Sequence, residues 1–169
     1  LKLNFWSLFC DPSAQGGLKE IQLKDAELGE RDGASTTIPD SVEEFTTLAR
    51  LELDSNKLTG LGVGLALAAS TLQVVNLEDN EFEMTGAEAF DRLGQVGSNG
   101  GTTSSSIREL TISRNDITGQ LPNLDRFPYL TKLLVRDTRL EGPLPNWSGN
   151  SWGDLAQLEV LDLSQNDFE

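Results

Sequence analysis

The stretch LQVVNLEDNEF, Leu72–Phe82, decides the fold of this chain, because its eleven-residue pattern recurs along the sequence. Three other close copies are LARLELDSNKL (Leu48–Leu58), IRELTISRNDI (Ile107–Ile117) and LEVLDLSQNDF (Leu158–Phe168). All four follow L-x-x-L-x-L-x-x-N-x-L, with other apolar residues at some leucine positions. Two weaker copies keep the apolar positions, at Leu18–Leu28 and Leu130–Leu140. They have Ala26 and Thr138 in place of the asparagine.

The six copies predict a solenoid, in which each unit buries its apolar face only against its neighbours. Their starts are 23 to 35 residues apart, which leaves room for insertions in some units. Within a copy, residues such as Leu51 and Leu53 alternate with polar ones and therefore point to one side of a short strand. The asparagine amide can satisfy backbone groups in the turn that follows. We expect an asparagine ladder along the array, with looser turns or ordered water at Ala26 and Thr138.

The segments after the strands carry a family resemblance. ITGQLP (Ile117–Pro122), LEGPLP (Leu140–Pro145) and IPDSVEEFTTL (Ile38–Leu48) resemble the plant-type leucine-rich repeat, whose signature is L-x-G-x-I-P. Asn76–Leu93 resembles the helix-backed unit of ribonuclease-inhibitor-type proteins. The resemblance implies an α/β solenoid: a leucine-rich-repeat curved right-handed superhelix with a parallel β-sheet on its concave face. Its backing is a hybrid of helical and extended segments.

The amino end resembles the end of a plant-type cap. In NFWSLFCD (Asn4–Asp11), Trp6, Cys10 and Asp11 match the cap pattern, whereas the cap's other cysteine falls at Asn4. We therefore expect a partial cap over residues 1–17 and a repeat domain of about six units over residues 18–169. Because no polar capping segment follows the last copy, the natural protein is expected to continue with repeats, a stalk or a membrane anchor. The alternative is that a partner covers this edge.

Composition narrows the function classes. The chain has 13 Lys and Arg against 27 Asp and Glu, a net charge of −14, which disfavours nucleic acid and anionic membrane surfaces as partners. It has no histidine, which removes histidine metal clusters, Ser-His-Asp triads and Cys-His dyads. No phosphate-binding or calcium-loop motif occurs. We expect no enzyme activity and no cofactor, and neighbouring carboxylates are interpreted as a solvated acidic face.

The predicted binding site is the concave face of the sheet, formed by the outward residues of the strands. The candidate residues are Glu52, Asp54, Asn76, Glu78, Asp79, Arg108, Thr111, Arg114, Lys132, Leu134 and Arg136. Acidic residues gather on the middle strands, and basic residues, including Arg139, gather on the next two. Such a bipolar face can orient a complementary protein. The alternative is a charged stripe that only keeps the chain soluble.

The resemblance implies binding, since plant-type repeats form receptor-kinase ectodomains and secreted inhibitors of cell-wall polysaccharide hydrolases. We predict a non-catalytic recognition module, extracellular or on the cell surface, for a protein, a peptide or a cell-wall glycan. The first alternative is a structural subunit docked in a larger intracellular or organellar assembly, and the second is a polysaccharide-processing enzyme. Asn146-Trp147-Ser148 matches the N-glycosylation acceptor. The tract Gly94–Ser106 is interpreted as a surface loop or, alternatively, as a ligand-contacting island.

Overall fold

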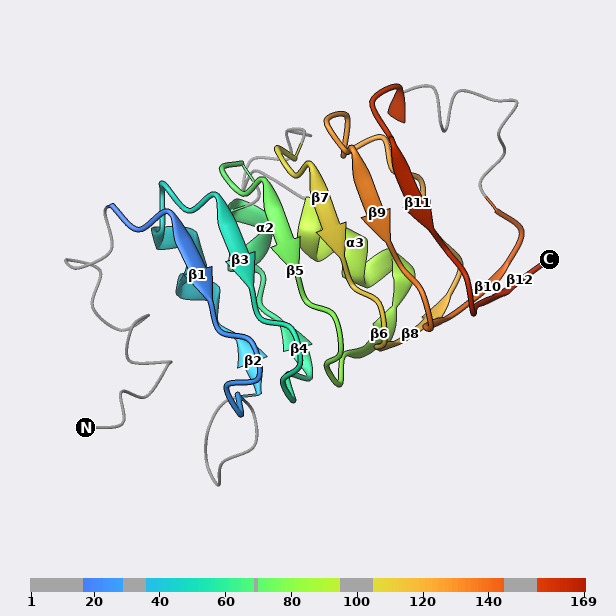
Figure 1. Cartoon of the computed structure of the whole chain (residues 1–169), viewed down its shortest axis with the longest axis horizontal. Helices are drawn as coiled ribbons and strands as arrows, with labels where there is room; N and C mark the ends of the chain where they lie inside the picture. Colours follow the sequence, from blue (N-terminus) through green and yellow to red (C-terminus); the bar gives the residue numbers. More distant parts are fainter. Residues whose placement is uncertain (1–16, 29–35, 69, 95–104, 145–154) are drawn as a thin grey trace.

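The computed structural model describes residues 17–28, 36–68, 70–94, 105–144 and 155–169. Their main element is a six-stranded parallel sheet in the order β1-β3-β5-β7-β9-β11 (Figure 1). Its strands are β1 (Glu20–Gln22), β3 (Arg50–Glu52), β5 (Val74–Asn76), β7 (Glu109–Thr111), β9 (Lys132–Leu134) and β11 (Val160–Asp162). Each strand lies in one of the sequence copies, which we number as coils one to six. The predicted leucine-rich-repeat solenoid is confirmed.

The sheet is in register from coil to coil. The middle residue of each strand points into the core, and Leu51, Val75, Leu110 and Leu133 are at most 1% exposed. In coil six the corresponding Leu161 is only partly buried, because in the described chain it has a neighbouring coil on one side. The flanking residues of each strand point away from the core, onto what we call the open face.

A second set of short strands follows the turns. β6 (Glu83–Thr85), β8 (Asp116–Gly119), β10 (Arg139–Gly142) and β12 (Asp167–Phe168) form a four-stranded parallel sheet, and β2 (Thr37–Ile38) pairs with β4 (Gly60–Leu61). Figure 1 places these strands along one edge of the solenoid. β8 and β10 end at Gly119 and Gly142, which have φ of 76° and 78°. Glycine adopts this left-handed conformation without steric cost, so the chain can leave the sheet there.

The backing is a hybrid, as the sequence predicts. η2 (Asp40–Glu44), α2 (Gly64–Ala68) and α3 (Gly86–Gly94) lie behind the first coils, whereas coils four and five continue in extended strands (Figure 1). α3 begins where Thr85 Oγ1 accepts a hydrogen bond from Glu88 N at 3.2 Å, the arrangement of a helix N-cap. Its buried side carries Ala89, Phe90 and Leu93.

The turn after each strand shares one backbone feature in all six coils. The residue just before the rung position has a left-handed φ: Asp25 50°, Ser55 54°, Asp79 59°, Arg114 53°, Asp137 54° and Gln165 58°. The turns at Ala26 and Thr138 keep this φ, although in coil one Glu27, directly after Ala26, is also left-handed, with a φ of 54°. Backbone hydrogen bonds between coils reach this turn, such as Asp25 N to Asp54 O at 3.1 Å. Looser turns or ordered water at Ala26 and Thr138 stay a prediction.

Some predictions fall on residues that the structure does not describe. These are the cap over residues 1–17, apart from Gly17, the glycosylation acceptor Asn146, and most of the tract Gly94–Ser106. Among the helices in the described ranges, none has the length and apolar character needed to span a bilayer.

Candidate functional site

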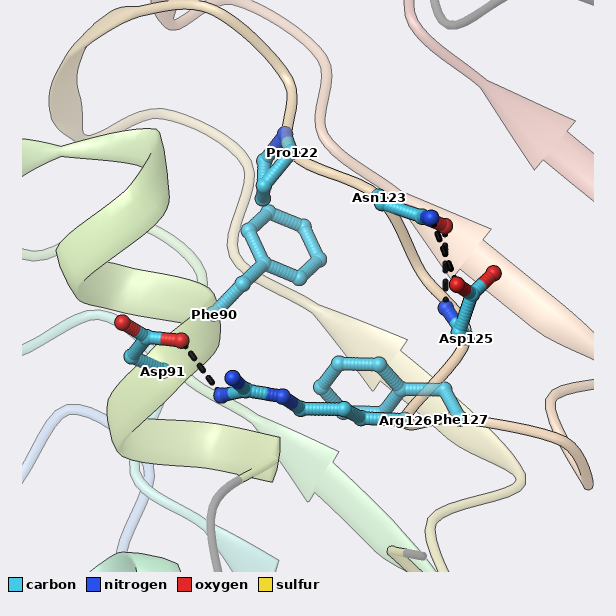
Figure 2. A pocket seen from close by; sticks show the side chains of 7 residues that line it. All are labelled: Phe90, Asp91, Pro122, Asn123, Asp125, Arg126 and Phe127. Carbon is cyan, nitrogen blue, oxygen red and sulfur yellow. Dashed lines mark hydrogen bonds and ion pairs between the residues drawn. The ribbon is translucent and has the colours of Figure 1, made fainter. Parts of the chain in front are cut away.

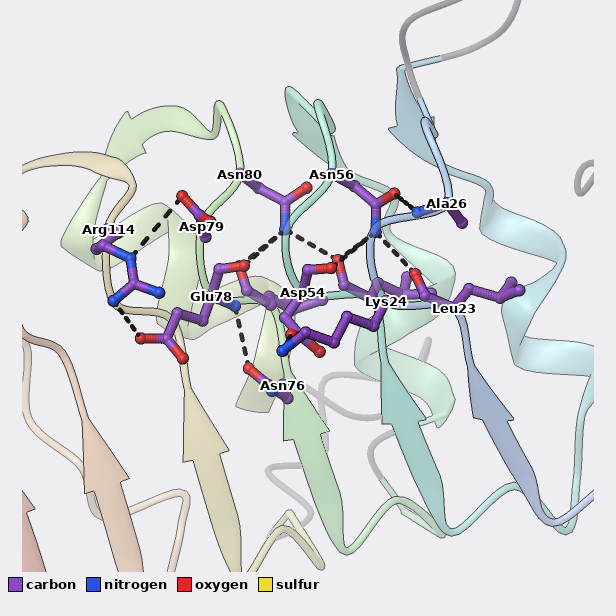
Figure 3. A network of polar contacts seen from close by, with 12 residues as sticks. Leu23, Lys24, Ala26, Asp54, Asn56, Asn76, Glu78, Asp79, Asn80 and Arg114 are labelled. Carbon is purple, nitrogen blue, oxygen red and sulfur yellow. Dashed lines mark hydrogen bonds and ion pairs between the residues drawn. The ribbon is translucent and has the colours of Figure 1, made fainter.

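The asparagine ladder forms along the turns (Figure 3). Asn56 Nδ2 donates to Leu23 O of coil one at 2.9 Å, and its Oδ1 accepts from Ala26 N and Leu28 N at 3.0 and 3.1 Å. Asn80 makes the same kind of bridge to Leu53 O and Leu58 N of coil two. Each asparagine therefore serves the backbone of the preceding coil as well as its own.

The bridge changes between coils four and five. Asn115 still bonds back to Leu77 O and Phe82 N of coil three, but Thr138 donates forward, to Asn166 Oδ1 of coil six. Among the described residues, Thr138 gives coil four no side-chain hydrogen bond. In its place Ser113 Oγ of coil four accepts from Arg136 N at 3.0 Å.

The open face has three rows of outward side chains across the strands. The first row is Glu20, Arg50, Val74, Glu109, Lys132 and Val160, and the second is Gln22, Glu52, Asn76, Thr111, Leu134 and Asp162. Two residues further along each coil stand Lys24, Asp54, Glu78, Ser113, Arg136 and Ser164. The rows place eight of the eleven candidates on this face. Asp79 and Arg114 lie on the turn, and Arg108 precedes β7.

The predicted acidic and basic groups largely neutralise one another. Arg114 pairs with Glu78 at 3.1 Å and with Asp79 at 3.8 Å across the two middle coils (Figure 3). The carboxylate of Asp54, only 8% exposed, pairs with Lys24 at 2.9 Å. Further pairs are Arg50 with Glu52 at 2.7 Å, Lys132 with Glu109 at 4.0 Å, and Arg139 with Asp116 at 2.9 Å. Ion pairs between and within coils therefore compensate most of the predicted acidic and basic residues, although Arg108 and Arg136 form no ion pair with any of the described residues.

Two candidate cations have partners that the sequence analysis did not identify. The Arg108 guanidinium lies 5.8 Å from the centre of the Tyr129 ring, and Tyr129 is 45% exposed. Arg136 Nε donates to Gln165 Oε1 at 2.7 Å. Tyr129 lies just before the strand of coil five, outside the repeat pattern, so the repeat offered no signal for it. Gln165 occupies the turn position in coil six that Arg114 has in coil four. Comparing these turn positions between coils could have identified Gln165 as a partner for Arg136.

Hydrogen bonds and charges on this face shift the pKa values of three groups. The hydrogen bond and charge of Asp54 raise the pKa of the Lys24 ammonium above 10.5. The hydrogen bond from Arg50 to Glu52 raises the pKa of that guanidinium. Hydrogen bonds from the side chain and backbone of Ser164 lower the pKa of Asp162 below 3.8. Each shift favours the charged form, as expected for groups that are paired or hydrogen-bonded at a surface.

Two hollows lie off the open face. One, of about 340 Å³, lies between α3 and the segment after β8 and is lined by Phe90, Asp91, Pro122, Asn123, Asp125, Arg126 and Phe127 (Figure 2). Its floor holds the edge-to-face ring pair of Phe90 and Phe127, at most 3% exposed, and an ion pair joins Arg126 to Asp91. The other, of about 770 Å³, runs along the turns beside Asn80 and Asn115. Among the described residues, no three His, Cys, Asp or Glu side chains converge to hold a metal ion.

The repeat register, the parallel sheet and the asparagine ladder define a class of protein. The chain is a leucine-rich-repeat solenoid, and a family model described as "Leucine Rich repeat" matches residues 68–90. Its resemblance to plant receptor-type leucine-rich-repeat proteins, predicted from the sequence, is confirmed by the relatives that follow.

The particular relatives are plant receptors. The chain is 25% identical over 163 residues to the receptor-like kinase TMK2 of Arabidopsis thaliana, a match that covers 95% of this chain and 16% of that protein. It is 28% identical to the plant peptide hormone receptor RGFR1 in a structure with RGF2, with a TM-score of 0.67, covering 90% of this chain and 21% of the receptor. The BIR2 ectodomain of Arabidopsis thaliana shares the fold, with a TM-score of 0.61, 24% identity, and coverage of 88% and 67%. The chain thus spans about one sixth of the curated relative.

Proposed function

We propose that this chain is a recognition module that binds a peptide or protein on the open face of its six-stranded sheet, without catalysis. The observation that carries the proposal is the face itself. Within the described residues it has no covering element, and it presents partly buried side chains of mixed chemistry on consecutive strands, including Val74, Asn76 and Leu134. A rigid sheet of this kind offers a preorganised surface, which reduces the entropy lost on binding.

The relatives support the class of ligand. RGFR1 is described as a plant peptide hormone receptor, and its structure contains RGF2. TMK2 is described as a receptor-like kinase. We therefore propose an extracellular or cell-surface location, with a peptide preferred over a cell-wall glycan. Modification of Asn146 by a glycan and a partial cap over residues 1–17 belong to the same proposal.

The alternative is a structural unit that docks permanently through its last coil. Leu161, Leu163 and Phe168 are only partly buried, whereas Leu133, Val135 and Leu140, their counterparts in coil five, are fully buried. A further coil or a partner on this side would complete their burial. In this alternative, the repeat domain over residues 18–169 packs against another unit on that side.

The test of the binding proposal uses a displayed library of random twelve-residue peptides, selected against the whole chain. Asn76→Arg places a large charge on the middle of the open face, and Val63→Arg places the same charge on a residue that is 52% exposed beside α2. We expect selected peptides to lose at least about tenfold in affinity with Asn76→Arg and less than about twofold with Val63→Arg. Selected peptides that bind both variants equally would contradict binding on the open face.

A further inference from the structure

Most charged residues on the middle strands of the open face are engaged with one another, whereas Arg108 and Arg136 contact the uncharged Tyr129 and Gln165. Arg50 and Glu52, Lys132 and Glu109, and Arg114 and Glu78 are paired at 2.7, 4.0 and 3.1 Å. A charged ligand group in the middle of the face would have to compete with these pairs and their hydration. Exposed pairs contribute little to stability, but they leave each charge largely compensated. The middle coils are therefore poor sites for selecting a charged side chain.

An uncharged row remains between these pairs. Asn76 on β5 is in register with Thr111 on β7, and Thr111 is in register with Leu134 on β9. Neighbouring strands lie about 4.8 Å apart, so the row is about 10 Å long. An extended chain advances about 3.3–3.6 Å per residue, so the row matches about three ligand residues. Val74, next to this row on β5, adds apolar surface.

Two residues of the row have unused hydrogen-bonding capacity. Asn76 Oδ1 accepts from Glu78 N at 3.1 Å, an interaction that orients the amide (Figure 3). Its Nδ2 group makes no hydrogen bond to any of the described residues, and neither does the hydroxyl of Thr111, a residue 8% exposed. An amide donor beside a hydroxyl suits a peptide carbonyl and its neighbouring N–H. Leu134, the third residue of the row, offers only apolar contact.

We infer that the open face selects an extended peptide segment with no charged side chain over β5, β7 and β9. The segment hydrogen-bonds through its backbone to Asn76 and Thr111 and places an apolar side chain on Leu134. This inference rests on the proposed function and specifies its ligand. The sequence predicted that two charge patches select the ligand; we infer that an uncharged row selects it, because ion pairs compensate most of the charges in those patches.

The test measures how tightly the peptides selected from the random twelve-residue library bind to two sets of variants of this chain. Leu134→Asp puts a carboxylate into the uncharged row, and Asn76→Ala with Thr111→Val removes its hydrogen-bonding groups. The matched control is Glu78→Gln with Arg114→Gln, which removes both charges of one pair at once. Circular dichroism melts check that each variant folds as the parent chain does.

We expect the selected peptides to share a central run of uncharged residues that contains an apolar side chain. Their affinity falls at least about tenfold with Leu134→Asp and about three- to tenfold with the double variant of Asn76 and Thr111, as expected for lost apolar and hydrogen-bonding contacts. The charge-pair control changes it by less than about threefold.

The opposite pattern overturns the inference. In that case, peptides with charged central residues are selected, the charge-pair control abolishes their binding, and Leu134→Asp leaves it unchanged. Such peptides would still lose binding with Asn76→Arg, so the proposed function would stand while its ligand chemistry would be wrong. Peptides that bind all of these variants alike would contradict both the inference and the proposed function.

Discussion

The junction between coils three and four and the junction between coils four and five are built differently. At the first, Asn115 donates to Leu77 O and accepts from Phe82 N of the preceding coil. At the second, Thr138 donates forward, and the buried hydroxyl of Ser113 accepts from Arg136 N. A rung therefore serves the coil before it, so the effect of a missing asparagine falls on the preceding junction rather than on its own turn.

This difference explains why the two weak copies are not equivalent. Ala26 has no described coil before it, and the amides of its own turn are satisfied by Asn56 of coil two. Thr138 lies inside the array, where Ser113 adds a side-chain hydrogen bond to the backbone bonds that join coils four and five. Losing an asparagine costs little at the start of a ladder and more within it.

The largest expected effect is at the intact junction. Asn115→Ala removes three donated hydrogen bonds and one accepted hydrogen bond at a residue that is 6% exposed. Because it leaves buried backbone groups without partners, we expect a loss of about 2–4 kcal/mol in the free energy of unfolding, measured by urea denaturation. Asn166→Ala, at a partly exposed rung, is the matched control and should cost about 1 kcal/mol. Equal losses in the free energy of unfolding for the two variants would show that the burial of an asparagine does not determine how much it stabilises the chain.

A smaller effect of opposite sign is expected at the altered junction. Thr138→Asn restores an amide that can bond back to coil four, and the free energy of unfolding should rise by about 0.5–1.5 kcal/mol in the same denaturation assay. Ser113→Ala, which removes the acceptor for Arg136 N, should lower it by about 1 kcal/mol. If Thr138→Asn does not raise the free energy of unfolding, the hydrogen bond to Ser113 is already sufficient to hold the junction between coils four and five.

The smallest effect compares two serines at the same position. Ser113 bonds across coils, whereas Ser164 donates to Asp162 within its own coil, with Oγ 2.6 Å from the carboxylate. Ser164→Ala should raise the pKa of Asp162 toward its ordinary value of 3.8, as followed by NMR titration of the carboxyl carbon. Because the pKa of Asp162 is lowered in the folded chain, its stabilisation is present above pH 3.8 and is lost as the pH falls through the folded value.

The variant should therefore lose less stability on acidification than the parent chain does. The control is Ser113→Ala, which should leave the titration of Asp162 unchanged. A lowered pKa that persists in Ser164→Ala would assign the shift to another group, such as the nearby charge of Arg136.

Much of the fold could be predicted from single residues and their spacing. The alternation in Leu48–Leu58 and its copies identifies which side chains enter the core, because side chains alternate between the two faces of a strand. Thr85 and Glu88 mark the start of α3 through a capping pattern that is local in sequence. The outward residues of the strands follow from the same alternation, and this is why the candidate face contains Asn76, Thr111 and Leu134.

The sequence by itself therefore determined the solenoid, its core, its hybrid backing and the identity of its outward residues, since each depends on local periodicity. Only the tertiary structure decided how the coils meet: that Arg114 neutralises Glu78, that Thr138 bonds forward to Asn166, and that Tyr129 lies beside Arg108. These contacts join residues 21 to 36 positions apart in the chain, and they depend on the exact direction of each side chain. Periodicity fixes the face on which a residue lies, but the register between coils fixes its partner. That register joined most residues of the two predicted charge patches in ion pairs and left the uncharged row between them.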